Sequence, residues 1–190
     1  MKRDDAQLES WIWDSVNYLW VGFLDNADAR NRGAELELDY SVGERLGLFA
    51  SVGYLRTRVD ELTTFDLDLD DFVDRKGIEE AKSPRWQYDL GFDWDFGADW
   101  HARVEVEGRD DSRFGYYHDQ TIDAYTLLHA SVAYRIGRTE LQLWGRNLTD
   151  EDYAVHGLYF GNDPRKGWIN EPYYQLGQPR RVGVSVRYAF

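Results

Sequence analysis

The last ten residues of the chain alternate without interruption between apolar side chains and polar or small ones. The even positions are the apolar Val182, Val184, Val186, Tyr188 and Phe190, and the odd positions are Arg181, Gly183, Ser185, Arg187 and Ala189. A period of two residues predicts a β-strand with one apolar face and one polar face. Such a strand needs another apolar layer against its apolar face, and the rest of the sequence indicates what that layer is.

Seven further segments show the same alternation, so the sequence predicts about eight strands. The predicted strands cover residues 1–13, 34–40, 46–55, 86–96, 100–107, 128–136, 141–146 and 181–190. The first is the most weakly patterned, with Ala6, Leu8 and Ile12 on one face and a bend expected near Asp14 and Ser15.

The connections between these strands alternate between short and long. Short turns are expected at 42–45, 97–99 and 137–138, and long loops at 60–84, 110–120 and 148–178. Strands that are joined by a short turn must run antiparallel. All short turns should therefore lie at one end of the sheet and all long loops at the other. The predicted fold is an all-β, antiparallel, up-and-down meander that forms a single domain over residues 1–190.

The two faces of the predicted sheet differ in chemistry. The polar face carries a dense set of carboxylates, namely Glu35, Glu37, Asp39, Asp89, Asp93, Asp95, Glu105 and Glu107. Burial of so many charges in a dry core would cost several kcal/mol each, so this face must meet water or a charged partner.

The apolar face has aromatic residues at both ends and aliphatic residues between them. One aromatic group lies near the short turns and comprises Tyr40, Trp94, Phe96, Trp100, Tyr134, Tyr188 and Phe190. The other lies toward the long loops and comprises Tyr54, Trp86 and Tyr88. Two aromatic belts around an aliphatic band are typical of strands that cross a bilayer, and Trp86–Phe96 has the length of about 9–11 residues that a tilted spanning strand needs. A soluble sandwich or lipocalin-like barrel is the alternative, although its core aromatics would have little reason to gather at strand ends.

Composition excludes several other classes of protein. The formal net charge of −13 argues against a nucleic-acid partner. The absence of cysteine excludes disulfides and thiolate metal sites. The four histidines His101, His118, His129 and His156 show no metal-ligand spacing, and no catalytic motif is present. We therefore predict neither an enzyme nor a metal or cofactor site.

Three motifs resemble the TonB-dependent outer-membrane receptor family. Asn26–Glu37 is similar to a late-barrel strand of the pattern N…R-x-R-G-x-E-x-E, and Trp144–Tyr153 to the penultimate-strand motif N-L-[TF]-D-x-x-Y. Gly177–Phe190 is similar to the terminal strand G-x-P-R…F. The resemblance covers the whole chain, but only as the C-terminal part of a barrel of about twenty-two strands, without the plug domain and the TonB box.

The resemblance implies a multi-pass β-barrel in the bacterial outer membrane, with short periplasmic turns and long extracellular loops. The implied partners are outer-membrane lipid, the barrel assembly machinery, the plug domain with the remaining strands, TonB through the plug, and a small-molecule ligand. The ligand implied is a ferric siderophore or a similar scarce nutrient. The family's terminal assembly signal matches Arg181, Gly183, Val186, Tyr188 and Phe190.

The long loops are the candidate ligand-binding segments. Loop 148–178 carries aromatic and cationic side chains that suit an anionic, aromatic ligand, and the candidates are Tyr153, His156, Tyr159, Arg165, Lys166, Trp168 and Tyr173. The alternative, which we prefer, is that these side chains pack the loop onto itself. Loop 60–74 is rich in Asp and is expected to be a solvated acidic loop, because it lacks the glycine and distal glutamate of a calcium loop.

A second class of function is a self-standing, eight-stranded outer-membrane barrel with a structural or adhesion role. Eight strands can close, but the interior is then just wide enough for side chains. Rows of Glu and Asp with few inward Arg residues would fill it poorly.

Overall fold

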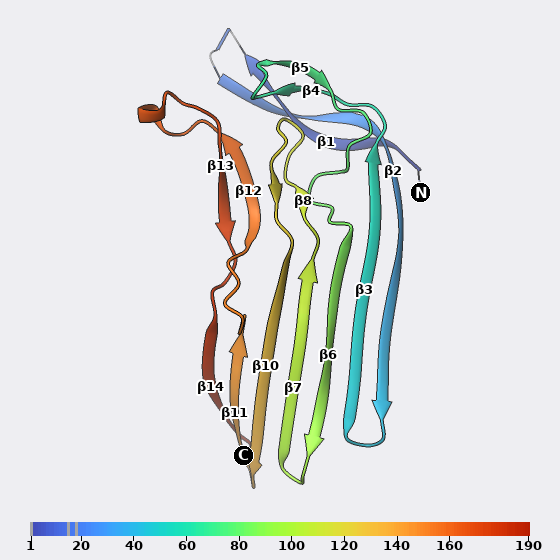
Figure 1. Cartoon of the computed structure of the whole chain (residues 1–190), viewed down its shortest axis with the longest axis vertical. Coiled ribbons are helices and arrows are strands. Elements are labelled where there is room, and N and C mark those ends of the chain that lie inside the picture. Colours follow the sequence, from blue (N-terminus) through green and yellow to red (C-terminus); the bar gives the residue numbers. More distant parts are fainter. Residues whose placement is uncertain (1, 15, 18) are drawn as a thin grey trace.

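The computed structural model describes residues 2–14, 16–17 and 19–190, apart from several side chains in the first two strands. It contains one large antiparallel sheet in the order β1-β2-β3-β6-β7-β10-β11-β14 (Figure 1). Its strands are β1 (Lys2–Asp14), β2 (Leu19–Val42), β3 (Leu46–Val59), β6 (Trp86–Phe96), β7 (Trp100–Arg109), β10 (Tyr125–Ile136), β11 (Thr139–Arg146) and β14 (Arg181–Tyr188). The predicted all-β meander is confirmed.

The short turns lie together at one end of the sheet, which we call the turn end (Figure 1). Each turn contains a glycine in the left-handed region, at Gly43, Gly97 and Gly137, with φ of 67°, 73° and 58°. That conformation is nearly free of strain only for glycine, which fixes where each hairpin reverses. The opposite end, where the long connections gather, is the loop end.

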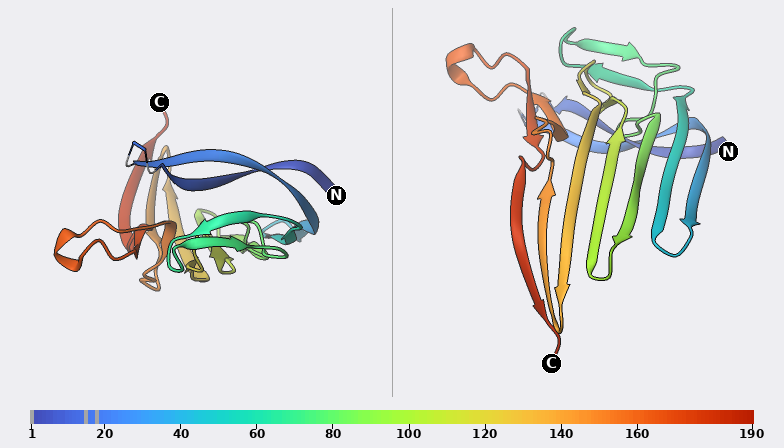
Figure 2. Two further views of the ribbon diagram at one scale, coloured as in Figure 1. Left: turned by 90° about the horizontal axis from the view of Figure 1, so that it is seen from above. Right: turned by 60° about the horizontal axis from the view of Figure 1, so that its bottom comes forward.

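The second strand is much longer than predicted. It begins at Leu19 rather than near residue 34, and its first half pairs with β1. Ala27 and Ala29 are buried in this first half. Alanine has a low intrinsic preference for strands, so the sequence gives little indication of this half, and we attribute it to packing against the loops. The side chains of Ala6 and Ile12, and residue Ser15, lie outside the described residues. From above, the β1–β2 ribbon crosses the open side of the curved sheet (Figure 2, left).

Each long connection contains a small hairpin where the sequence predicted only a loop. The hairpins pair β4 (Thr63–Asp66) with β5 (Asp71–Asp74), β8 (Ser112–Arg113) with β9 (Thr121–Ile122), and β12 (Ala154–Phe160) with β13 (Glu171–Leu176). The 3₁₀-helix η1 (Pro164–Lys166) lies at the tip of the last one. None of the described helices could span a bilayer.

The sheet leaves its apolar face uncovered. Leu36 and Val184, near opposite edges of the sheet, are 66% and 70% exposed. The buried hydrophobic residues instead lie mainly at the loop end, in one cluster around Leu8, Val59 and Tyr116 and another around Phe114 and Tyr159. A face this large and this apolar requires a partner or a lipid surface.

The aromatic residues of this face touch one another in belts, as the sequence predicted. At the turn end the rings of Trp94, Phe96, Trp100 and Tyr134 follow one another at centroid distances of 4.9, 5.8 and 4.5 Å. At the loop end the rings of Tyr54 and Trp86 lie 4.7 Å apart across β3 and β6.

The large sheet is open. Among the described residues no ladder joins β14 to β1 or β2, so β14 and the turn-end half of β2 each present an unpaired edge. We call the exposed apolar face of the sheet the outer face and the carboxylate-bearing face the inner face.

Candidate functional site

Three segments distant in sequence meet at the loop end, and we call their contacts the loop cluster. They are the loops 60–84, 110–124 and 148–178. Phe114, Ile122 and Tyr159 form its buried apolar centre, with Leu67 packed against them. Gly157 allows this packing, because a Cβ there would lie 2.6 Å from the Phe114 ring. Each loop contributes at least one ring or aliphatic side chain, so the loops order one another.

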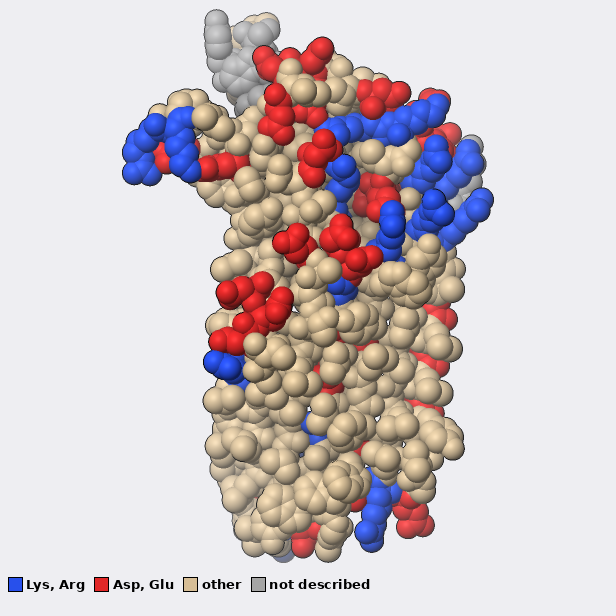
Figure 3. Space-filling view, in the orientation of Figure 1, with Lys and Arg blue, Asp and Glu red and all other residues tan. Residues whose placement is uncertain are grey.

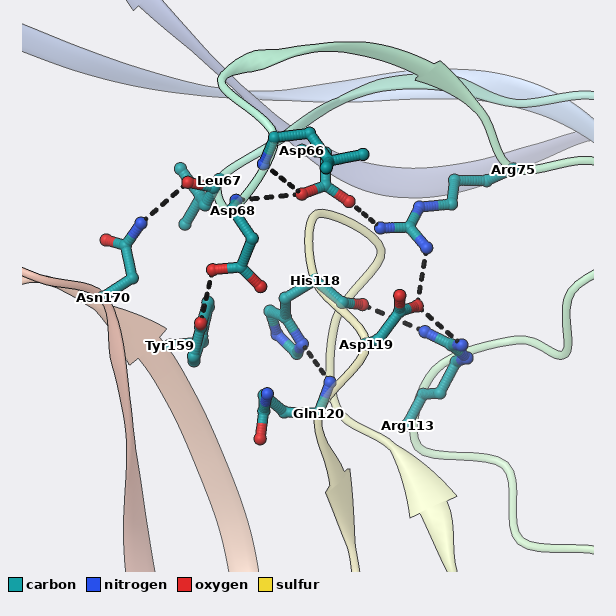
Figure 4. Close-up of polar contacts among 11 residues, drawn as sticks. Asp66, Leu67, Asp68, Arg75, Arg113, His118, Asp119, Gln120, Tyr159 and Asn170 are labelled. Carbon is teal, nitrogen blue, oxygen red and sulfur yellow. Dashed lines mark hydrogen bonds and ion pairs between the residues drawn. The ribbon is translucent and has the colours of Figure 1, made fainter.

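A chain of ion pairs surrounds this centre (Figure 4). The Arg75 guanidinium pairs with the Asp66 carboxylate and, at 2.6 Å, with the Asp119 carboxylate. The Asp119 carboxylate also accepts a hydrogen bond from Arg113 at 2.9 Å. Burial opposes ionisation of Asp119, but the hydrogen bond from Arg113 and the charge of Arg75 outweigh it and lower its pKa. The ion pairs therefore hold loop 60–84 to loop 110–124.

Loop 148–178 is fastened to loop 60–84 by two further hydrogen bonds. The Tyr159 hydroxyl donates to Asp68 Oδ1 at 2.5 Å, and the Asn170 amide donates to the Leu67 carbonyl at 2.9 Å (Figure 4). Burial, together with the hydrogen bond to Asp68, raises the pKa of Tyr159 to about 12. Tyr159 is a predicted ligand residue, but its ring and hydroxyl are both used in loop packing.

His118 is fully buried in the loop cluster, at 0% exposure, among the rings of Phe114, Tyr117 and Tyr159. Its Nδ1 accepts a hydrogen bond from the Gln120 backbone N–H at 3.1 Å, so Nε2 carries the proton of the neutral ring. Nε2 has no partner among the described residues. Burial, and then the charge of Arg113, lowers the pKa of His118 to about 4.

The other predicted ligand residues lie away from this centre. Arg165 pairs with Asp163 at 2.9 Å and Lys166 with Glu171 at 2.5 Å, so both cations are already matched by neighbouring carboxylates. Trp168, beside them at the tip of the β12–β13 hairpin, is 60% exposed.

The remaining three residues lie on the β12–β13 hairpin or at its base. The Tyr173 hydroxyl donates to Glu171 at 2.6 Å. Tyr153 packs on Tyr125 with ring centroids 4.5 Å apart, and its hydroxyl accepts from the Gln178 backbone N–H. His156 is partly buried on β12. The structure therefore does not bring the seven predicted residues together in one pocket.

The acidic segment 60–74 is only partly solvated. Asp66 is 4% exposed, and its Oδ1 accepts the backbone N–H groups of Asp68 and Leu69 at 2.9 and 3.1 Å. The expectation of a solvated acidic loop is therefore wrong for Asp66. The carboxylate is used as a turn cap and as the partner of Arg75, a role that composition alone does not reveal.

The inner face of the sheet carries the predicted carboxylates and a hollow of about 740 Å3. Its lining includes Glu35, Glu37, Asp89, Glu107, Arg109 and Tyr125. Arg103 lies lower on this face and donates to Asp93 at 2.7 Å and to Glu105 at 3.0 Å. The surface is polar and charged, which suits water or a polar occupant rather than a dry core.

Glu105, Glu107 and His129 bring three potential ligand atoms within 4.8 Å of one another on the inner face. His129 Nδ1, however, accepts the Asn147 backbone N–H at 3.0 Å, so Nε2 must carry the proton that it shares with Glu107 at 3.0 Å. A metal ion would need the lone pair at Nε2. His129 and Glu107 therefore form a hydrogen-bonded pair, and the trio does not fit a metal site.

Asn147 connects His129 to the segment that precedes the last strand. Its side chain bonds the Glu151 backbone N–H and carbonyl, both at 2.9 Å, and donates to the Gln178 carbonyl at 3.1 Å. Asp150 accepts from the Arg180 guanidinium at 3.0 Å. The two motifs noted in the sequence thus clamp each other at the point where β11 and β14 leave the sheet.

The predicted assembly signal lies on β14 and just beyond it. Val186 and Tyr188 face outward, at 67% and 52% exposure. A Cβ at Gly183 would lie 2.4 Å from the Trp144 indole, so this position admits only glycine without movement of the ring. Arg181 donates to the Gln178 side chain at 2.5 Å. Phe190 lies two residues after the strand ends, with its ring 5.3 Å from that of Tyr188.

Comparison with known proteins gives one family. The family model described as "TonB dependent receptor-like, beta-barrel" matches residues 4–148.

Solved structures with the same fold include the ferric yersiniabactin uptake receptor FyuA from Yersinia pestis, at 18% identity and a TM-score of 0.71 over 88% of this chain and 25% of that one. The siderophore receptor PiuA from Acinetobacter baumannii has 13% identity and a TM-score of 0.71 over 97% and 24%. The copper transporter OprC has 19% identity and a TM-score of 0.68 over 100% and 27%. The chain spans about a quarter of the length of each.

Proposed function

This chain belongs to the TonB-dependent receptor family, and on that premise we propose that it forms the C-terminal part of the β-barrel of an outer-membrane receptor that takes up a ferric siderophore or a similar scarce nutrient. The observation that carries the proposal is the contrast between the two faces of one open sheet. An exposed apolar face with aromatic belts suits lipid, and a carboxylate-lined face with a hollow suits an aqueous or protein-filled lumen.

The two unpaired edges support a partial barrel rather than a complete one. In a membrane every backbone N–H and C=O must find a partner, which open edges do not provide. We propose that the remaining strands of a receptor pair with β14 and β2, and that a plug domain fills the lumen and connects it to TonB. The open sheet does not favour the alternative of a self-standing eight-stranded barrel.

The loop end is the proposed extracellular surface. Trp168 and the partly buried Tyr173 and His156 suit an aromatic ligand by stacking, whereas Arg165 and Lys166 must first release Asp163 and Glu171. We propose that Tyr153 and Tyr159 shape this surface through packing. The similar structures include two siderophore receptors and a copper transporter, which supports a metal-complex ligand without identifying it.

The proposed route to the membrane is the barrel assembly machinery, which would recognise Arg181, Gly183, Val186, Tyr188 and Phe190. The outward exposure of Val186 and Tyr188 on a strand with a free edge supports this. Truncation of Phe190 should lower the amount of receptor in the outer membrane without changing the fold of protein refolded in detergent. Equal surface amounts of truncated and intact receptor would contradict the assembly role.

Two experiments test the function. First, the chain is refolded in detergent with and without upstream barrel sequence, and its migration on a gel is compared before and after heating. We expect a heat-modifiable species only when upstream sequence is present, and a compact heat-modifiable monomer of the chain alone would contradict the partial-barrel proposal.

Second, cells that lack their own receptors are given the full-length protein and supplied with radioactive iron in different siderophores. We expect iron accumulation with at least one siderophore, dependent on TonB. Uptake that persists without TonB would contradict the proposal, as would a failure of every iron complex under iron limitation.

A further inference from the structure

Four arginines gather on the outer face of the sheet at its loop end. They are Arg30 and Arg32 on β2 and Arg56 and Arg58 on β3. The register pairs Arg32 with Arg56 and Arg30 with Arg58. In Figure 3, blue side chains collect over the upper ends of β2 and β3, directly above a mostly tan surface. We call these four residues the arginine patch.

The arginine patch continues the lipid-facing side of the strands. The β2–β3 ladder runs from Ala29 to Val42 without a register shift. Arg30 and Arg32 are an even number of residues from Leu36 and Leu38, so their side chains lie on the same face of the strand. Thr57 and Val59, whose side chains lie on the opposite face of β3, are buried beneath the loops. The patch therefore points away from the lumen and away from the proposed ligand surface.

The charges of the patch are poorly compensated. Like charges directly opposite each other on two strands destabilise a sheet. Asp60 pairs with Arg30 at 2.7 Å and with Arg58 at 3.6 Å. Arg32 and Arg56 make no ion pair with any residue that the structure describes, on a chain whose net charge is −13. An external anion would remove this repulsion.

The height of the patch identifies the anion's source. The Ala34–Tyr54 pair lies one step below the Arg32–Arg56 pair on this face, and Tyr54 packs on Trp86 in the loop-end aromatic belt. At a rise of about 3.4 Å per residue, Arg32 and Arg56 lie about 7 Å beyond that belt and Arg30 and Arg58 about 14 Å. Aromatic belts mark the headgroup level, so the guanidinium groups reach the phosphate layer of the outer leaflet.

We propose that the arginine patch binds the phosphate groups of an anionic outer-leaflet lipid. The inference rests on the proposed function, because it requires the outer face to lie in a membrane. Arginine suits this role because its planar fork donates two parallel hydrogen bonds to one phosphate. The Arg32–Arg56 pair can take one phosphate between them, and Arg30 and Arg58 stay anchored to Asp60 beside it.

The test uses the full-length protein and the double substitution Arg32→Gln with Arg56→Gln. Vesicles contain phosphatidylcholine alone, or phosphatidylcholine with one tenth diphosphorylated lipid A. Lipid A retained by the protein after extraction and gel filtration is measured by mass spectrometry. Loss of two interfacial charges should lower lipid A affinity by roughly thirty-fold. The Arg32→Lys with Arg56→Lys variant should keep most of the binding.

The matched control removes two arginines at the turn end. Arg45 and Arg138 are exposed, and their side chains form no ion pair with the described residues. Arg45→Gln with Arg138→Gln should leave lipid A retention unchanged. Wild-type retention by the Arg32/Arg56 Gln variant would overturn the proposal, and so would an equal loss in the control. Competition by millimolar inorganic phosphate at full strength would also overturn it, by assigning the patch to a free anion.

Stability gives a second readout that changes sign. In detergent without anionic lipid, the Arg32/Arg56 Gln variant should be at least as stable as wild type, because the like-charge pair is gone. In lipid A vesicles the wild type should be the more stable, and an unchanged order in both media would contradict the proposal. If the protein fails to insert into pure phosphatidylcholine vesicles, the proposed function fails instead, and this outcome appears in every variant alike.

Discussion

The large sheet and the loop cluster solve the problem of burial in opposite ways. Toward the turn end, the sheet exposes Leu36, Val184 and their neighbours on one face and carboxylates on the other, so this part of the sheet has no core of its own. The loop cluster buries Phe114, His118 and Tyr159 and fastens them with ion pairs. Most of the internal packing of this molecule is therefore found at the loop end. The turn-end part of the sheet depends on its surroundings for burial, whereas the loop end provides its own.

The largest effect should come from the apolar centre of the loop cluster. Phe114→Ala should lower the local stability of the loops by about 3–5 kcal/mol, because it removes a buried ring and leaves a cavity. Hydrogen exchange of the amides in 110–124 and 154–160 measures this, while β6 and β7 should keep their protection. Leu69→Ala, at a side chain that is 68% exposed, is the control and should have little effect. Loss of protection throughout the sheet would show that the two regions are not independent.

A charge on the outer face tests the other half of the comparison. Val184→Arg should destabilise the folded receptor by about 2–4 kcal/mol in a bilayer, because it places a charge in the lipid layer. Ser185→Arg, one residue along and on the inner face, should cost much less. Urea titration of the full-length receptor in vesicles compares the two. Equal effects would mean that lipid does not cover the outer face.

The junction between the two regions should respond less strongly than either region. Asn147→Ala should cost about 2 kcal/mol, because it removes several side-chain hydrogen bonds from a buried site and leaves a positive φ of 49° without an asparagine. Thermal unfolding in detergent measures the loss. Asn147→Gly should recover the part that arises from backbone conformation and not the part from hydrogen bonding. Full recovery by glycine would assign the whole effect to the backbone.

Acid should loosen the loop cluster and spare the sheet. The folded pKa of His118, at about 4, lies below its ordinary value of 6.5, so the opened loops bind a proton more readily than the closed ones. Stability is full above pH 6.5 and declines as the pH falls toward 4, by about 1.4 kcal/mol between pH 7.5 and 5.5. Protonation also turns Nδ1 into a donor that faces the Gln120 N–H.

Hydrogen exchange at pH 5.5 and 7.5, after correction for the intrinsic rate, measures this decline. The His118→Gln variant is the control, and its loop protection should not change between the two values. A decline of the same size in the variant would assign the effect to groups other than His118.

The part of the fold that the sequence predicts is the part whose two faces differ in chemistry. Strict alternation in Trp86–Phe96 and in Arg181–Tyr188 locates strands, faces and belts without any knowledge of contacts. The first half of β2 is missed because Ala27 and Ala29 carry too little apolar surface to reveal the pattern until they are buried. The β8–β9 hairpin is missed because its strands have two residues each, too few for a period to be visible.

The loop cluster was beyond prediction for a different reason. Tyr159 is conspicuous as an aromatic loop residue, but its partner Asp68 lies 91 residues away. His118 follows two tyrosines in a segment that the sequence predicted only as a loop, and nothing local signals that its ring is buried at 0% exposure. A role that depends on contact between distant loops can be recognised only when the three-dimensional structure is known. A role that depends on the two faces of one strand can be recognised from the sequence.

The length of β2 links the proposed membrane wall to what stands above it. Twenty-four residues at about 3.3 Å each span about 80 Å, and a tilted strand needs only about 9–11 residues to cross the hydrocarbon layer. More than half of β2 therefore lies beyond the part that would cross the bilayer, and there it bends and crosses the open side of the sheet together with β1 (Figures 1 and 2). A molecule that approaches the lumen from the loop end would meet the β1–β2 ribbon first. Contact with the ribbon would therefore act directly on a strand that also forms part of the proposed membrane wall.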